Sequence, residues 1–212
     1  MTTADETRQR LLDAAGPLFA EQGLKATTVR VICDRAGVNL AAINYHFRDK
    51  KQLYHEAVRH AARCCDARVP IPDWPASTPP ERKLRDFVAM FLNRVAVDHE
   101  PAWHAQLLMR ELTHPTPACA EFVGEFVQPC FKALSGVLQE LLPDVPELKS
   151  RLVAFSIVGQ CLHYRVARPV IEHLIGAGEF RNYGVDLLAD HITEFSLAAI
   201  GRLAGRAKKK EK

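Results

Sequence analysis

Apolar residues recur at spacings of three and four along almost the whole chain, which is the pattern of helices that bury one face. Leu11, Leu18 and Phe19 belong to the first such stripe, and Leu84 and Phe87 begin another. The strict alternation typical of half-buried strands does not occur in the sequence. The pattern therefore predicts an all-α protein.

Helix-capping residues divide the first third of the chain into four predicted helices. Glycines at positions 23 and 37 permit the left-handed backbone with which many helices end. The side chains that can cap the second, third and fourth helices are Thr27 or Thr28, Asn39 and Asp49. The four helices are predicted at about residues 4–22, 28–36, 40–47 and 49–68.

A proline-rich stretch over residues 68–80 interrupts the helical pattern, because five of the chain's 13 prolines fall within it. A further helix begins at about residue 80, and others are predicted at about 101–113, 117–142, 146–175 and 183–204. Pro129 and Pro169 lie inside two of these helices. Each proline removes a backbone donor, so kinks are expected near Glu125 and Arg165.

Composition and charge restrict the function classes. No apolar run is long enough for a membrane-spanning helix, and the six cysteines form no Cys-x-x-Cys pair, so we expect a cytoplasmic protein with reduced thiols. Residues 1–68 hold 11 Lys and Arg against 8 Asp and Glu, residues 69–201 hold 11 against 16, and residues 202–212 hold 6 against 1. A polyanion, if bound, would meet the N-terminal part and the tail, although ordinary surface variation also produces such differences.

Residues 28–47 have the pattern of a helix-turn-helix, in which two short helices meet at a sharp turn. The first helix of this motif crosses the DNA backbone and the second enters the major groove, so one face of the pair is buried and the other meets DNA. The predicted inward residues are Val29, Ile32, Ala36, Val38, Ile43 and Phe47. The predicted outward residues of the second helix are Leu40, Ala41, Asn44 and Tyr45. Six Lys and Arg between residues 25 and 51, Arg30 among them, can bind phosphates beside this helix.

Five segments stand out between about residues 8 and 58, namely LLDAA (11–15), LFAEQG (18–23), TTVRVI (27–32), AGV (36–38) and YHFRDKKQL (45–53). Together, and in register, they resemble the N-terminal domain of TetR-family transcriptional regulators. The segments VGQCLHYRVARP (158–169) and NLAAIN (39–44) further resemble a subgroup with a CerR-like C-terminal domain.

This resemblance implies an all-helical homodimer that binds operator DNA through its N-terminal helices and a small molecule through its C-terminal domain. The implied domains are a helix-turn-helix DNA-binding domain at residues 1–48 and a helical ligand-binding and dimerisation domain at 49–204. The basic composition of residues 205–212 separately predicts a disordered tail. No cofactor is implied.

Matching by position assigns DNA contacts to individual residues. Phosphate contacts fall on Thr28, Tyr45, His46 and Lys50, and base-facing positions on Leu40, Ala41 and Asn44. The family commonly has tyrosine where this chain has Asn44, whose amide can pair with adenine. A packed aromatic turn is the alternative interpretation of residues 45–47, of which Phe47 is expected in the core.

A set of apolar side chains together with a few polar ones on the C-terminal helices gives the candidates for an effector pocket. They are Arg94, Trp103, Gln106, Met109, Arg110, Phe126, Phe131, Gln160, His163 and Tyr164. Alternatively, the two phenylalanines are plain core, Arg110 pairs with Glu111 or Glu100, and Gln160 and His163 lie at a dimer seam. The predicted dimer interface consists of Leu152, Phe155, Ile192, Phe195 and Ala199.

No metal site or enzyme activity is expected. His60 and Cys64 lie one helical turn apart with Cys65 beside them, but a closed zinc site needs about four convergent ligands and no second cluster has suitable spacing. The histidines near residues 99–114 do not share one helix face, so we expect them at the surface or in a pocket.

The sequence thus predicts a ligand-responsive repressor. The alternatives are an activator, or a small-molecule-binding protein or enzyme whose helix-turn-helix is only structural.

Overall fold

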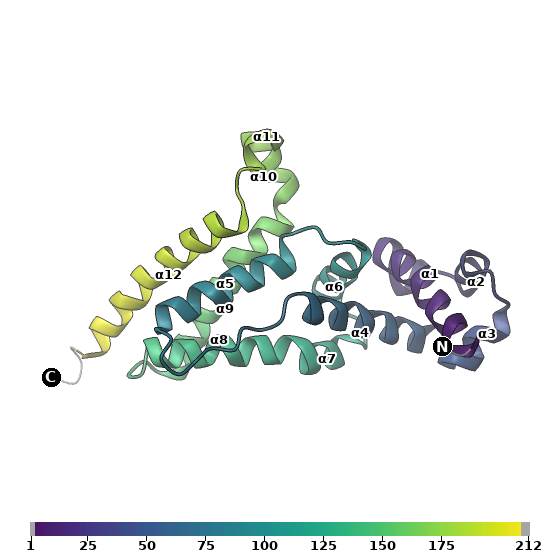
Figure 1. Ribbon diagram of the computed structural model, residues 1–212, viewed down its shortest axis with the longest axis horizontal. Coiled ribbons are helices and arrows are strands. Elements are labelled where there is room, and N and C mark those ends of the chain that lie inside the picture. Colours follow the sequence, from purple (N-terminus) through teal and green to yellow (C-terminus); the bar gives the residue numbers. More distant parts are fainter. Residues whose placement is uncertain (1–2, 209–212) are drawn as a thin grey trace. The chain divides into compact units, whose positions relative to one another are not determined.

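The computed structural model describes residues 3–208, and every regular element among them is a helix, which confirms the predicted all-α fold (Figure 1). None of these helices is both long and apolar enough to cross a membrane. In chain order they are α1 (Thr3–Ala26), α2 (Val29–Ala36), α3 (Leu40–Phe47), α4 (Lys50–Arg68), α5 (Pro80–Val95), α6 (Trp103–Thr113), α7 (Cys119–Phe122), the π-helix η1 (Val123–Val127), α8 (Gln128–Leu141), α9 (Glu147–Val166), α10 (Arg168–Ile175), α11 (Ala177–Phe180) and α12 (Val185–Lys208).

The helices form two compact units, each made from two separate stretches of chain. The first unit comprises Met1–Arg68 and Asp98–Val127, and the second comprises Val69–Val97 and Gln128–Lys212. Because the units group residues by their contacts, they do not test the functional boundary expected at residue 48. That boundary stays a prediction.

Helices α1, α4 and α6 surround the core of the first unit. Leu11, Phe19 and Leu107 are fully buried there, and the ring of Phe19 meets the ring of Tyr54 edge-on with centroids 5.0 Å apart. Ile43 and other apolar residues of α2 and α3 pack against the same core. The buried stripe that the sequence pattern predicts for residues 4–22 therefore provides the surface on which the helix-turn-helix is assembled.

A fully buried carboxylate joins α4 to α6. Glu111 accepts a hydrogen bond of 2.7 Å from the Tyr54 hydroxyl through one oxygen, and bonds of 2.7 and 2.9 Å from the N–H and hydroxyl of Thr116 through the other. Burial, together with the neighbouring Glu111, raises the pKa of Tyr54, so its hydroxyl keeps the proton that it donates. The buried charge is thus fully used in hydrogen bonds.

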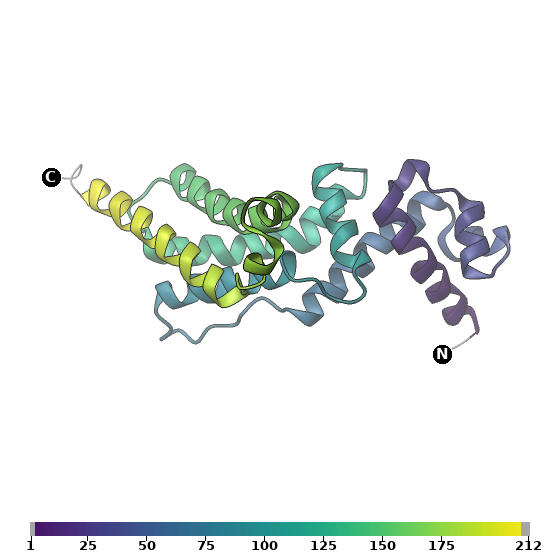
Figure 2. The same cartoon turned by 90° about the horizontal axis from the view of Figure 1, so that it is seen from above.

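In the second unit, α5 packs against α8, α9 and α12 (Figure 2). Leu84, Phe87 and Val88 on α5 are buried in this core, as their spacing predicts. On the facing helices, Leu134, Ile157 and the other members of the same cluster complete it.

The two prolines inside predicted helices act differently. The kink expected near Glu125 takes the form of the π-helical turn η1, which contains this residue and lies just before Pro129. Pro169 lies in the first turn of α10, where its missing N–H needs no partner, and α9 ends at Val166. The helix predicted over residues 146–175 with a kink near Arg165 is therefore two helices, α9 and α10, which meet at Ala167.

The end of the chain also departs from the prediction. Helix α12 continues to Lys208, so residues 205–208 are helical rather than part of a disordered tail. The remainder of the predicted tail, residues 209–212, lies outside the described residues. Helix α11 was not predicted from the sequence. It follows Gly176, whose φ of 87° lets the chain turn between α10 and α11.

The packing of Trp103 on α1 yields a first prediction. A Cβ added at Gly16 would lie 2.5 Å from the Trp103 ring, so Gly16→Ala should lower the free energy of unfolding by about 1–3 kcal/mol through overpacking. Gly136→Ala is the matched control, because nothing lies within 4 Å of a Cβ there and alanine favours helix. Urea unfolding of both variants measures the difference. Equal stability of the two variants would contradict the packing described here.

Candidate nucleic-acid interface

Local hydrogen bonds build the turn between α2 and α3. Thr28 caps α2 by accepting a bond from the Val31 N–H at 3.3 Å, and Asn39 caps α3 by accepting one from the Ala42 N–H at 3.1 Å. Gly37 takes a left-handed conformation with φ 64° between the two helices. The sequence predicts the roles of Asn39 and Gly37 and leaves the cap of α2 between Thr27 and Thr28, of which Thr28 is the cap.

A side chain of α1 completes the turn. Arg10 donates from Nη2 to the carbonyl oxygens of Ala36, at 2.6 Å, and Gly37, at 3.2 Å. Sequence reasoning missed this role, because the partners lie 26 and 27 residues away and no local pattern marks them. The guanidinium thus satisfies carbonyls at the end of α2 that have no partner within the helix.

The two faces of the helix-turn-helix agree with the predicted inward and outward sets. Among the inward residues, Ile32, Ala36, Ile43 and Phe47 are buried, and Val29 and Val38 are partly buried against the core of the first unit. The outward residues Leu40, Ala41, Asn44 and Tyr45 are exposed, Tyr45 to 80%. Helix α3 therefore presents two apolar side chains, an amide and a phenol to solvent.

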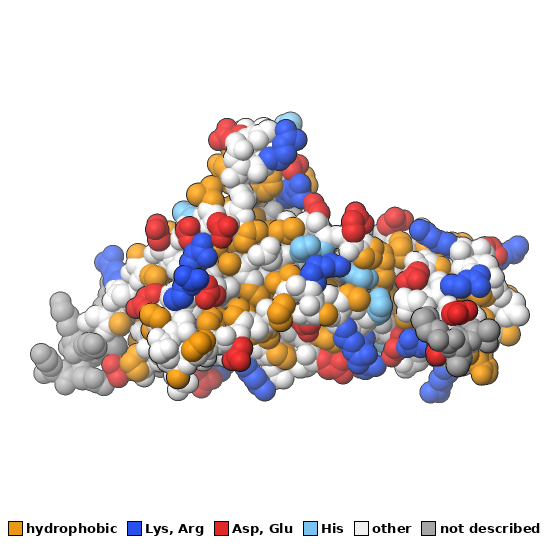
Figure 3. Space-filling view, viewed as in Figure 1, with side chains coloured by type: hydrophobic (Ala, Val, Ile, Leu, Met, Phe, Trp, Pro, Cys, Tyr) orange, Lys and Arg blue, Asp and Glu red, His pale blue; other side chains and the backbone are white. Residues whose placement is uncertain are grey.

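Basic side chains flank this exposed face, and Lys and Arg project from the surface around α1–α3 in Figure 3. Arg30 is exposed on α2, with its Nε 4.0 Å from an oxygen of Asp34. Lys50 lies differently, because its ammonium donates to the carbonyl oxygen of Thr27 at 2.8 Å. Lys50 thus joins the start of α4 to the residue before the α2 cap, a role that the sequence does not indicate.

The aromatic turn at the end of α3 has both an exposed and a packed part. His46 is half-buried, with its ring centroid 4.9 Å from that of Tyr45 and 6.3 Å from that of Phe47. The Arg8 guanidinium lies 5.1 Å from the Phe47 ring centroid and bonds to Glu56 at 2.6 Å. The core position expected for Phe47 is confirmed, while the phosphate contact of His46 stays a prediction.

Two family profiles together match most of the chain. The profile described as bacterial regulatory proteins, tetR family, matches residues 11–57. The profile of the C-terminal domain of the HTH-type transcriptional dual regulator CecR matches residues 80–200, more than half of the sequence. The chain belongs to the TetR family. The family resemblance seen in the sequence is confirmed for both parts of the chain, and so is the expectation of a transcriptional regulator rather than an enzyme.

Individual TetR-family relatives match shorter parts of the chain. The transcriptional repressor KstR2 of Mycolicibacterium smegmatis is 35% identical over 102 residues, which are 48% of this chain and 47% of that protein. The regulator AcrR of Shigella flexneri is 47% identical over 53 residues, 25% of each chain. This chain thus spans half or less of the length of these curated relatives.

A solved TetR-like transcriptional regulator from Rhodococcus sp. RHA1 has the same fold. The two structures superpose with a TM-score of 0.62 over 92% of this chain and 96% of that one, at 20% sequence identity.

The predicted effector residues divide between the two units. In the first unit, Trp103 is buried against Gly16, Gln106 is exposed and Met109 is half-buried. Arg110 donates to the main-chain oxygens of two α1 residues, Glu21 and Gln22, at 3.3 and 3.2 Å, instead of pairing with Glu100 or Glu111. Phe126 stacks on Phe122 with centroids 6.3 Å apart. Their role toward an effector stays a prediction.

The other five predicted effector residues lie in the second unit. Arg94 donates to the Val69 oxygen at 2.7 Å and to the Cys130 sulfur at 3.2 Å. Phe131 stacks on Phe155 with centroids 5.6 Å apart. The remaining three residues are on α9, where Gln160 and Tyr164 are half-buried and His163 is exposed. Burial raises the pKa of Tyr164.

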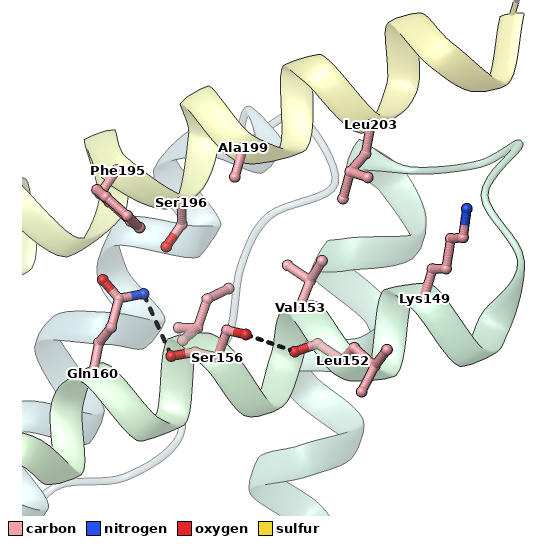
Figure 4. A pocket seen from close by; sticks show the side chains of 10 residues that line it. Lys149, Leu152, Val153, Ser156, Gln160, Phe195, Ser196, Ala199 and Leu203 are labelled. Carbon is pink, nitrogen blue, oxygen red and sulfur yellow. Dashed lines mark hydrogen bonds between the residues drawn. The ribbon is translucent and has the colours of Figure 1, made fainter.

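A groove of about 410 Å³ lies between α9 and α12 (Figure 4). Of the predicted dimer residues, Leu152, Phe195 and Ala199 line it, and Gln160 of the effector set lines it as well. Leu152, Phe155 and Phe195 are 57%, 56% and 63% exposed, which is unusual for such large apolar side chains. Ile192 is buried in the core of the second unit, so within one chain it is not available to a partner.

One group of potential metal ligands differs from the sequence expectation. His104, expected at the surface or in a pocket, is buried on α6. Its ring lies against that of His60, with centroids 5.4 Å apart, and His60 and Cys64 share a face of α4. The fold thus adds a third ligand-type side chain to the pair noted in the sequence.

The Thr27 contact separates two roles of Lys50. Lys50→Met should lower the free energy of unfolding by about 1 kcal/mol, because the Thr27 carbonyl loses its charged donor. Lys51→Met is the matched control, since Lys51 is exposed and should change stability by less than about 0.5 kcal/mol. Chemical denaturation of both variants without DNA tests the assignment. A Lys50→Met protein as stable as the Lys51→Met protein would show that this bond contributes nothing.

Proposed function

We propose that this TetR-family protein is a homodimeric, operator-binding repressor that a small apolar or amphipathic molecule releases from DNA. The observation that carries the proposal is the division of α3 into a buried face and an exposed face. Leu40, Ala41 and Asn44 stand on the exposed side, where the recognition helix of a helix-turn-helix contacts base edges. Repression is supported by relatives named as repressors, of which KstR2 is one.

The exposed residues of α3 have distinct chemical capacities. The amide of Asn44 can donate to and accept from adenine at once, whereas Leu40 and Ala41 can only pack against apolar groups such as the thymine methyl. Arg30, Thr28, Tyr45, His46 and Lys50 supply the groups proposed to contact phosphates. Operator DNA is thus the proposed partner, and the cytoplasm is the proposed location.

A dimer is proposed because α9 and α12 leave large apolar side chains uncovered. Leu152, Phe195 and Ala199 line the groove of Figure 4, and Phe155 is exposed on α9 as well. Such patches on soluble proteins commonly mark association sites, and a two-fold dimer is the commonest closed assembly. A two-fold dimer would present two recognition helices to a near-palindromic operator.

The effector class is proposed from the helices of the C-terminal domain, which combine apolar faces with a few polar groups such as Arg94 and Gln160. Thermodynamic linkage requires that the effector and the operator weaken each other's binding by the same factor. The coupling between the two sites is therefore measured by comparing effector affinity with and without operator DNA.

Base and phosphate contacts should respond differently to mutation. Asn44→Ala should cost about 1–3 kcal/mol of operator binding, concentrated at one base pair per half-site, because the bidentate amide contact is lost. Arg30→Ala should weaken binding to operator and random DNA alike and make affinity less dependent on salt. Fluorescence anisotropy with an operator selected from genomic fragments, over a series of salt concentrations, measures both effects. Equal losses for Asn44→Ala on operator and on random DNA would refute the base contact.

The dimer surface has an equally direct test. Phe195→Glu should convert the dimer to monomers, because an unpaired carboxylate would be buried in an apolar seam. Leu112→Glu is the matched control, because it places the same charge at an exposed apolar position of the first unit. Sedimentation velocity reports the masses. An intact Phe195→Glu dimer would place the interface elsewhere.

A further inference from the structure

Three potential metal ligands converge in the first unit, at the contact of α4 with α6. His60 and Cys64 lie one turn apart on α4, and His104 is the second residue of α6. One ligand atom from each of the three lies within 4.8 Å of the others. Histidine side chains are visible at the surface over α6 in Figure 3.

The separation of the first two ligand atoms fits a tetrahedral ion. The sulfur of Cys64 lies 3.6 Å from Nε2 of His60. A tetrahedral Zn²⁺ with bonds of about 2.0–2.1 Å to nitrogen and about 2.3 Å to sulfur holds two such atoms about 3.6 Å apart. The same distance also suits a weak thiol–imidazole hydrogen bond, so this contact alone does not identify a ligand site.

His104 supplies the independent observation. It is 7% exposed, and neither of its ring nitrogens has a hydrogen-bond partner among the described residues. A buried imidazole without partners is costly, because it loses its bonds to water and gains none. An imidazole nitrogen that has no hydrogen-bond partner can offer its lone pair to a metal ion.

We infer that His60, Cys64 and His104 bind a zinc ion that joins α4 to α6. Two imidazoles and a thiolate are ligands that suit Zn²⁺, whereas Mg²⁺ and Ca²⁺ require oxygen ligands. Three protein ligands leave the fourth position to water. Binding displaces the proton of the Cys64 thiol to solvent. The site does not rest on the proposed repressor function, because zinc binding is measured without DNA.

The expectation against a metal site depended on the lack of a second ligand cluster in the sequence. His104 lies 40 residues beyond Cys64, and its distance from His99 and His114 says nothing about which helix it faces. The fold supplies the convergence, because α6 packs against α4.

Cobalt spectroscopy of the reduced, chelator-treated full chain tests this site. Co²⁺ should bind at one ion per chain and give thiolate-to-cobalt charge transfer in the near ultraviolet, and added Zn²⁺ should remove the band. Cys64→Ser should abolish the band, while Cys65→Ser, the neighbouring thiol on the same helix, should retain it. No band in the wild type, or a band lost only in Cys65→Ser, would overturn the inference.

A stability measurement distinguishes zinc ligation from ordinary packing of His104. Zn²⁺ should raise the Tm of the wild type, whereas Mg²⁺ should not. His104→Leu should raise the Tm of the metal-free protein, because two unpartnered nitrogens disappear, and should weaken zinc binding by more than about 100-fold, the upper range for loss of a mere supporting group. His173→Leu, at an exposed histidine, is the control. Unchanged zinc affinity in His104→Leu would refute its role, and if this variant does not fold, the cobalt spectra of the cysteine variants decide.

Discussion

The carboxylate of Glu111 is the interaction on which the arrangement of the first unit depends. A charged group with no exposed surface is tolerated only when its hydrogen bonds are made, and Tyr54 and Thr116 make them. Removing one donor from a buried charged acceptor costs about 1–3 kcal/mol or more, which exceeds the effect of most surface substitutions. Because Tyr54 belongs to α4 and Glu111 to α6, the register of these helices is set by a directional bond in addition to apolar packing.

Helix α4 extends this constraint toward α2 and α3. Lys50 at its first residue bonds to the Thr27 carbonyl, and further along Arg59 pairs with Glu56 at 2.9 Å and with Glu121 on α7. Lys50, Tyr54 and Arg59, at successive positions along α4, thus each bond to a group outside this helix. The α2–α3 pair is held by Lys50 of α4, by Arg10 of α1 and by apolar contacts with the core of the first unit, so its position depends on both α1 and α4.

What the sequence predicts well in this protein depends on neighbours along the chain. The cap at Asn39, the left-handed Gly37 and a cap of α2 at Thr27 or Thr28 were predicted, because a cap or a turn needs only residues up to four positions away. The contact of Arg10 with the turn and that of Tyr54 with Glu111 could not be predicted. Their partners lie 26 and 57 residues away, and other side chains of the chain could donate equally well. Pro169 shows a local limit, because the same residue can kink a helix or begin one.

Which face of an apolar helix is buried could not be predicted from the sequence either. Phe195 and Ile192 are three residues apart on α12 and equally apolar, yet one is exposed and the other is buried within its own chain. A helix that is apolar on more than one side does not reveal which side its own domain covers. His104 presents the same problem on α6, where only the position of α4 decides that the ring meets His60.

Because α4 is held by directional bonds, a ligand that acts on DNA binding through the first unit has few ways to do so. Hydrogen bonds such as those of Lys50 and Tyr54 weaken steeply once donor and acceptor separate or tilt, so a shift of α4 breaks them rather than stretching them. Such an element has discrete arrangements and not a continuous range of positions. A ligand can favour one arrangement only by binding it more tightly than the other. Regulation of the α2–α3 pair through α4 would therefore be a switch between states, with its size limited by the difference in ligand affinity.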